Sequence, residues 1–165
     1  MSIFVITKRT RDMRKPNNHK LFNKIDSIIN DYADNKRLFC GGCCYAAYVI
    51  ARNLSNHNIP YKVAVYQAGY ATRCRTLKGV CKNDGCAHVA IVVNDNGTDR
   101  IIGRTDNIER ALNSRLISYG ENWKIKFYEN INWRELEEVY YNNDWNWMYD
   151  TSNNGTLFAD IASLF

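Results

Sequence analysis

Residues 40–44 have the sequence CGGCC, which places thiols directly before and after two glycines. The residues three, four, seven and eleven positions after Cys43 are all apolar, which is the spacing of one buried face of a helix. They are Ala46, Ala47, Ile50 and Leu54. The spacing predicts a helix from Cys43 to about Ser55, with Cys43 in its first turn and on its buried face. The same count from Cys44 gives a poorer apolar face, so Cys43 is the better candidate for a reactive thiol and Cys44 a neighbouring core residue.

A helix N-terminus provides the surroundings that a nucleophilic thiol needs. It carries roughly half a positive charge and has unpaired N–H groups, and both lower the pKa of a nearby thiol. The same kind of N–H group stabilises an oxyanion, a role that we expect for the main chain at Gly42 and Cys44. The glycines also let a substrate approach the backbone closely. The segment therefore indicates nucleophilic attack on a carbonyl carbon.

Such a thiol needs a base, and the chain has only three histidines. His19 and His57 lie in polar segments and are expected to be exposed. His88 begins the apolar run HVAIVV, which predicts a strand over 88–93. A cysteine at a helix N-terminus facing a histidine at the start of a strand is the arrangement of thiol catalysis, so His88 is the predicted base.

The group that would orient the imidazole is harder to find. Asn96-Gly97 is a strong signal for a two-residue hairpin turn, so the strand predicted over 98–103 should return beside 88–93. In that register Gly103 faces Ala90, so a glycine, and not an acid, lies on the returning strand near His88. Asp106 lies beyond the strand, and strict alternation points it to the other face. The site is then a Cys-His dyad, a triad completed by Asp106, or a related fold without the chemistry.

The surrounding elements predict one α+β domain over residues 1–165. The spacing of apolar residues favours helices over 19–35 and 107–119, and a third from a cap at Asn132 to about Tyr141. Strands are predicted over 2–7, 61–67 and 124–129, with an irregular stretch from Ala68 to Ala87 and a last apolar segment over 157–165.

The order GGCCYAAYVIARNL, a strand, HVAIVV, a turn and a second strand resembles the papain-like cysteine hydrolases. It is most similar to small bacterial and phage members with a transglutaminase-like layout, over residues 38–105. Papain-type enzymes carry Cys-Gly-Ser-Cys and an aromatic residue where this chain has CGGCCY. The resemblance implies a papain-like core, in which a helix packs on an antiparallel sheet with Cys43 as the nucleophile and His88 as the base. It implies a thiol hydrolase or acyl transferase acting on a peptide or another amide, without a cofactor.

Charge and cysteine content keep two other classes open. The net charge of +5 divides into +11 over residues 1–126 and −6 over residues 127–165. We expect the acidic segment to pack across the basic part, so nucleic acid is a less favoured partner. Zinc is an alternative, with spacings that suit it at Cys40–Cys43 and Cys81–Cys86, completed by Cys74 or His88, and it would imply a small nucleic-acid-binding protein. The other alternative is an inactive papain-like binding or structural protein.

The remaining features concern location and origin. No apolar run approaches the roughly 18 residues of a membrane span, and the first residues do not have the pattern of a signal peptide. We therefore expect a cytoplasmic protein without a membrane partner. The 21 asparagines and two prolines are typical of an AT-rich genome, so a phage-encoded protein, found in the host cytoplasm or the virion, is one interpretation.

Overall fold

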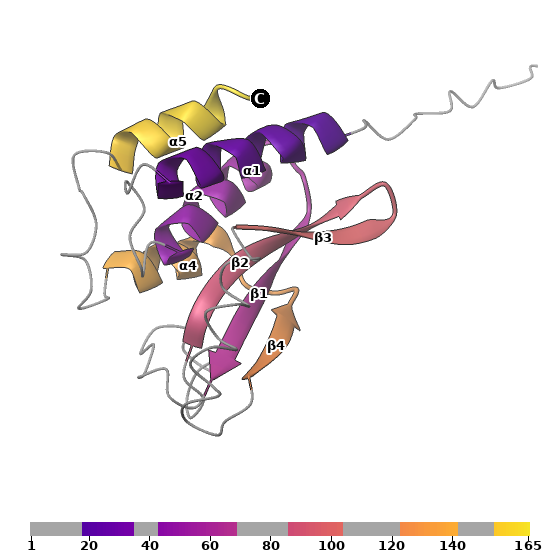
Figure 1. Ribbon diagram of the computed structural model, residues 1–165, viewed down its shortest axis with the longest axis vertical. Helices are drawn as coiled ribbons and strands as arrows, with labels where there is room; N and C mark the ends of the chain where they lie inside the picture. The colour runs from indigo at the N-terminus through magenta and orange to yellow at the C-terminus, as the bar shows by residue number, and fades with distance from the viewer. Residues whose placement is uncertain (1–17, 35–42, 69–85, 104–122, 142–153) are drawn as a thin grey trace, which may run out of the picture.

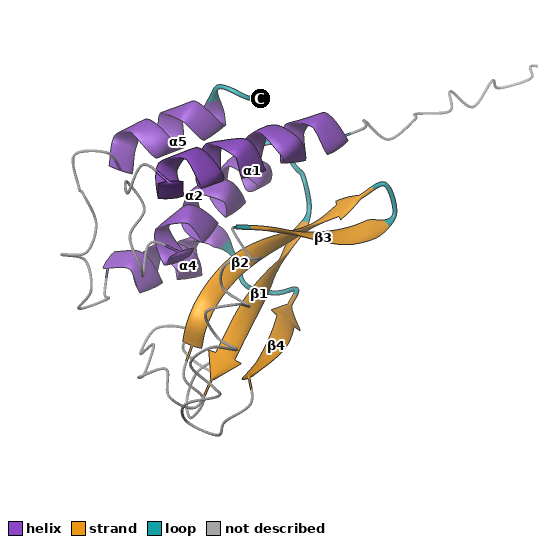
Figure 2. Cartoon of the chain, viewed as in Figure 1, coloured by secondary structure: helices purple, strands orange, loops and turns teal. Residues whose placement is uncertain are grey.

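The computed structural model of the chain describes residues 18–34, 43–68, 86–103, 123–141 and 154–165. The described helices are α1 (His19–Asp34), α2 (Cys43–Asn56), α4 (Trp133–Tyr141) and α5 (Asn154–Ala162). The described strands are β1 (Tyr61–Ala68), β2 (Cys86–Asp95), β3 (Thr98–Ile102) and β4 (Trp123–Tyr128). They form an antiparallel sheet in the order β3-β2-β1-β4. The helices gather on one side of it, so the fold is α+β, as predicted (Figures 1 and 2).

Most predicted elements that fall on described residues are confirmed, but several strand ends are wrong. β2 begins at Cys86, which the sequence placed in an irregular stretch, because Cys86 pairs with Gln67 of β1. β4 begins at Trp123 and ends at Tyr128, one residue earlier at each end than predicted. The apolar segment predicted over 157–165 overlaps a helix, α5, which begins earlier, at Asn154, and ends at Ala162. The strand predicted over 2–7 and the helix predicted over 107–119 lie outside the described residues.

The turn between β2 and β3 is the one that the sequence predicted. Asn96 and Gly97 have φ angles of 54° and 92°, and two consecutive positive values are the mark of a type I′ hairpin turn. The side-chain oxygen of Asn94 accepts a hydrogen bond of 3.0 Å from the Gly97 N–H. Ile91 consequently pairs with Ile102, which is the predicted register.

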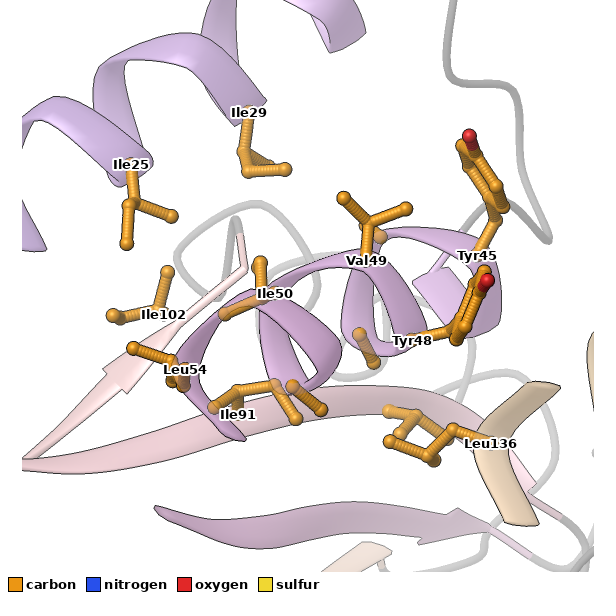
Figure 3. Packing of buried hydrophobic residues seen from close by; sticks show 14 of the residues in the cluster. Ile25, Ile29, Tyr45, Tyr48, Val49, Ile50, Leu54, Ile91, Ile102 and Leu136 are labelled. Atoms are coloured by element: carbon orange, nitrogen blue, oxygen red, sulfur yellow. The ribbon is translucent and has the colours of Figure 1, made fainter. Parts of the chain in front are cut away.

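The core forms around α2, which lies between the sheet and the other helices (Figure 3). Every residue of α2 from Cys44 to Ala51 is buried, so this helix has no polar face over its first two turns. Cys44 is 3% exposed, whereas Cys43 is only half-buried. Cys44 is therefore a core residue, as predicted, and Cys43 lies at the edge of the core, packed against it. Because α2 is enclosed on several sides, counting apolar residues along one face does not rank its two cysteines.

Both faces of the central strands are buried. The residues that face the helices belong to the main core and come from alternate positions, including Val63, Val65, Val89, Ile91 and Val93. The intervening positions are buried as well: Ala64, Tyr66, Ala90 and Val92 are each at most 1% exposed. The start of β2, where His88 lies, is therefore an interior part of the molecule.

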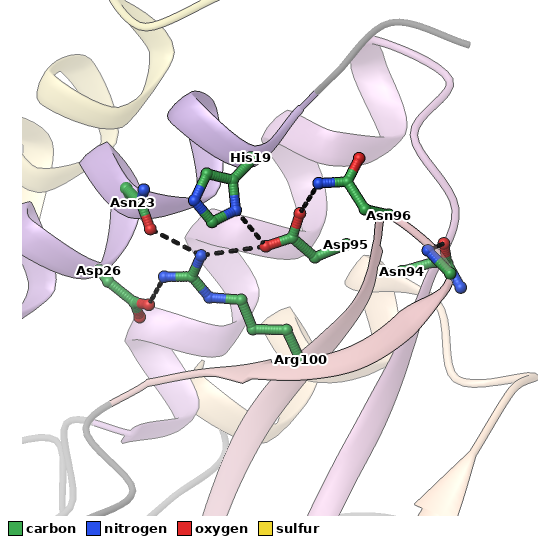
Figure 4. Close-up of polar contacts among 8 residues, drawn as sticks. His19, Asn23, Asp26, Asn94, Asp95, Asn96 and Arg100 are labelled. Atoms are coloured by element: carbon green, nitrogen blue, oxygen red, sulfur yellow. Dashed lines mark hydrogen bonds and ion pairs between the residues drawn. The ribbon is translucent and has the colours of Figure 1, made fainter.

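A polar network attaches α1 to the β2–β3 hairpin (Figure 4). His19 Nδ1 of α1 donates a hydrogen bond of 2.8 Å to the Asp95 carboxylate at the end of β2. Arg100 of β3 donates to Asp95 as well, and to Asn23 and Asp26 of α1. His19 and His57 are both exposed, as the sequence predicted. The network fixes the hairpin against the helical layer at the end of β2 far from His88.

Candidate functional site

The Cys43 sulfur lies at the first residue of α2, against the beginning of β2. It is within hydrogen-bond reach of the His88 imidazole, of the Val89 main-chain N–H and of the Cys44 thiol. As the first residue of a 14-residue helix, it also lies at the positive end of the helix dipole. The thiol therefore has a base, a main-chain donor and a second thiol around it.

These contacts lower the pKa of Cys43 well below the ordinary thiol value of 9.0. The largest cause is the hydrogen bond from the Cys44 side chain, followed among the lowering effects by the hydrogen bond and charge of His88 and by the Val89 N–H. Burial acts in the opposite direction, because a thiolate is poorly solvated in the interior. The donors outweigh burial, so the site favours the thiolate, which is the nucleophilic form.

The His88 ring is held from its other side by the main chain. Its Nε2 lies 2.9 Å from the carbonyl oxygen of Gly103 in a buried hydrogen bond. A carbonyl oxygen only accepts, so Nε2 carries a proton and donates it. The edge of the ring also meets the Tyr66 ring of β1, at 5.4 Å between centroids. Because Nε2 is engaged with Gly103, Nδ1 is the nitrogen that remains for the Cys43 thiol.

Gly103 has a backbone conformation that suits this contact. Its φ of +129° is one that residues with a side chain rarely adopt. The sequence predicted that β3 includes Gly103, but the strand ends at Ile102 and the chain turns there. The turn brings the Gly103 carbonyl to His88, although Gly103 itself lies beside Ala90.

The edge of β2 explains why Cys43 reaches a main-chain N–H. Along the described chain, β3 pairs with β2 only from Ile91 to Asp95, while β1 pairs with β2 along its other edge. The N-terminus of α2 meets β2 just before β3 begins to pair, at Val89. The end of α2 and the start of β2 thus meet at the sulfur, and the residue that follows β3 contacts the histidine beside it.

The structure brings together two of the predicted site residues, Cys43 and His88. Cys44, expected to contribute its N–H, is a core residue whose thiol acts on Cys43. Gly42 and Asp106 lie outside the described residues. Sequence reasoning missed the Val89 N–H and the Gly103 carbonyl. The hairpin register was the available signal, since it placed Gly103 opposite Ala90, two residues along β2 from His88.

Other kinds of site find little support in the described ranges. No group of three metal-ligating side chains occurs there, and Cys40, Cys74 and Cys81 of the zinc hypothesis lie outside them. Within the described part of the chain no helix is both long and apolar enough to cross a membrane. An open hollow of about 610 Å³ lies between residues 55–61 and 129–132, at the opposite end of α2 from Cys43.

Comparison of the chain with protein-family models, curated proteins and solved structures finds no match.

Proposed function

We propose that the protein is a papain-like cysteine hydrolase or acyl transferase that acts on an amide or a related acyl bond. The observation that carries the proposal is the contact of a half-buried thiol at a helix N-terminus with a buried imidazole. The pKa of the Cys43 thiol is lowered by three separate donors, and groups with strongly shifted pKa values cluster at functional sites. A thiol that only fills space in a core has no need of them.

In the first half-reaction the Cys43 thiolate attacks the carbonyl carbon of the substrate. The C–S bond forms while the π electrons of the carbonyl move to its oxygen, giving a tetrahedral oxyanion. Main-chain N–H groups in the first turn of α2 are available to this oxyanion, because the first turn of a helix leaves them without a partner. The intermediate collapses as the C–N bond breaks, and His88, protonated at Nδ1, gives its proton to the leaving amine.

The second half-reaction releases the acyl group from Cys43. A water molecule, or the amine of an acceptor in a transferase, attacks the thioester carbonyl while His88 Nδ1 takes its proton. The C–S bond then breaks, the thiolate is restored and the carboxylic acid or the new amide leaves. His88 thus acts as acid and then as base, and no cofactor takes part.

The alternative of an inactive scaffold rested on the glycine at position 103. The Gly103 carbonyl accepts the hydrogen bond that an acid would have accepted, so this glycine is no longer an argument against chemistry. The enzyme is therefore the better-supported proposal.

The test is site-resolved alkylation with iodoacetamide from pH 5 to 9, with the rate at each cysteine read by mass spectrometry. We expect Cys43 to react faster than the other cysteines below pH 7 and to lose that advantage in His88→Ala. His57→Ala is the matched control, since His57 lies beyond the other end of α2 and should leave the profile unchanged. A p-nitrophenyl ester then serves as an acylation probe, and the acyl group should appear on Cys43.

Two results would contradict the proposal. One is slow reaction of Cys43 throughout, with the pH profile of an ordinary buried thiol. The other is a fast reaction that His88→Ala leaves unchanged, because the imidazole would then not be what lowers the pKa of the Cys43 thiol.

A further inference from the structure

We infer that the main-chain carbonyl of Gly103 is the third member of the catalytic group and acts as the positioning group for His88. The inference rests on the proposed function. It assigns to the backbone a role that was expected of an acidic side chain, with Asp106 as the candidate.

The first argument is the direction of the hydrogen bond. The His88 Nε2 and the Gly103 oxygen are 2.9 Å apart and buried, so water does not compete for either group. The oxygen accepts in every protonation state of the ring, because a carbonyl has no proton to give. Nε2 therefore keeps its proton in both the neutral and the charged imidazole, and Nδ1 alone gains and loses one. This is what a base requires if its ring is to stay in place between the two half-reactions.

The second argument is the conformation of Gly103. Its φ of +129° is strained for any residue with a side chain. A Cβ built there would lie 3.4 Å from the Ala90 Cβ, which is ordinary van der Waals contact. Space for a methyl group therefore exists, and backbone conformation is what an alanine would disturb.

The third argument is the surroundings of the ring. Cys43 of α2 and Tyr66 of β1 are titratable side chains that lie against His88 in the described part of the chain. A neutral carbonyl fixes the position of the ring and its proton without adding a negative charge. The thiolate of Cys43 is then the counter-charge of the protonated imidazole, which suits a thiol whose pKa is already lowered by Cys44 and Val89.

The experiment measures alkylation of Cys43 by iodoacetamide against pH in Gly103→Ala, Gly97→Ala and Asp106→Asn. Gly97→Ala is the matched control, because Gly97 also has a positive φ, +92°, but lies in the turn at the far end of the same hairpin. We expect Gly103→Ala to slow the reaction about tenfold at pH 6, the effect of one pKa unit on the fraction of thiolate. The rate at pH 9 should stay close to that of the wild type, because the thiolate then forms without His88. Gly97→Ala and Asp106→Asn should follow the wild-type profile.

A second measurement needs no variant. Long-range ¹H–¹⁵N correlation spectra of the wild-type protein, with His88 assigned from His88→Ala, report which ring nitrogen holds the proton. We expect the neutral ring to be protonated at Nε2, with slow exchange of that proton. A ring protonated at Nδ1 would overturn the inference, even if Gly103→Ala fails to fold.

The outcomes separate the inference from the proposed function. A wild-type profile in Gly103→Ala, or loss of the low-pH rate in Asp106→Asn, would overturn the role of Gly103 and leave the Cys43–His88 pair intact. An ordinary profile for Cys43 in the wild-type protein would instead remove the proposed function. Unfolding of Gly103→Ala is recognised by faster alkylation of all cysteines at every pH.

Discussion

At the scale of single residues, the thiol of Cys44 lowers the pKa of Cys43 more than any other described group does. We predict that Cys44→Ala raises this pKa, because the thiolate loses its strongest donor. Cys44→Ser should retain most of the effect, since a hydroxyl also donates. The measurement is the pH midpoint of Cys43 alkylation in both variants.

Comparison of the two Cys44 variants separates hydrogen bonding from packing. Cys44 is buried, and the serine and alanine side chains are both smaller than a thiol, so both variants disturb the core in a similar way. Equal midpoints in the two variants would therefore argue that the thiol acts through packing. A midpoint for Cys44→Ala equal to that of the wild type would remove Cys44 from the site altogether.

The residues that could be predicted are those whose side chains do the chemistry. The sequence directly shows a cysteine after two glycines and a histidine at the start of an apolar run. Cys43 and His88 could therefore be paired from the sequence. The Val89 N–H and the Gly103 carbonyl belong to groups that nearly every residue has. Their roles depend on where a strand ends and which way the chain turns, and no residue type records that.

At the scale of elements, the contact of α1 with the β2–β3 hairpin is expected to depend on pH. The pKa of Asp95 is lowered, first by the hydrogen bond from His19 and then by Arg100. The folded protein therefore binds fewer protons at Asp95 than the unfolded chain does. The resulting stability is present above the unfolded pKa of about 3.9 and is lost as the pH falls through the lower folded value.

We predict that Asp95→Asn lowers the free energy of unfolding at pH 7 and that its difference from the wild type is smaller at pH 2. Urea unfolding at the two pH values measures this. Asp99→Asn is the control, because Asp99 pairs with Lys62 within the sheet and does not hold α1. The interpretation fails if the deficit of Asp95→Asn is the same at pH 2 and pH 7.

Local patterns determine the elements themselves to a large extent. The spacing of apolar residues located α1 and α2, and the Asn96-Gly97 turn set the register of β2 and β3. Asn132 caps α4, because its side-chain oxygen accepts hydrogen bonds from the N–H groups of Arg134 and Glu135. The strand ends were missed because pairing with a neighbouring strand decides them. Cys86 is in a strand since Gln67 lies opposite, which is information from elsewhere in the chain.

At the scale of the whole molecule, the two described helices of the acidic segment, α4 and α5, pack on α2 and α1 from the basic part of the chain. Asp160 of α5 accepts a hydrogen bond of 2.6 Å from Tyr32 of α1. Glu137 of α4 accepts one of 2.9 Å from Tyr48 of α2, whose hydroxyl in turn accepts from Arg52. These contacts join helices from both ends of the chain around α2. Periodicity shows that each helix has an apolar face, but it does not say which helix will cover it.

Among the described helices, α2 is the one that supplies residues to the thiol site, so stability and thiol chemistry should be separable. Leu157 of α5 is 1% exposed and belongs to the core, and α5 contacts α1 and α2. We predict that Leu157→Ala lowers the free energy of unfolding by about 2–4 kcal/mol through loss of buried surface and a residual cavity. Urea unfolding measures the loss, and Thr156→Ala, an exposed change in the same helix, should cost far less.

In the same variant, the pH midpoint of Cys43 alkylation should stay at the wild-type value in native buffer. The groups that lower its pKa come from the first turn of α2 and from the start of β2, and none belongs to α5. A shift of the midpoint in Leu157→Ala would show that packing of α5 reaches the N-terminus of α2. An unchanged midpoint beside a lower stability would instead mean that the sheet edge and the helix start hold the thiol and imidazole together, while the outer helices supply stability alone.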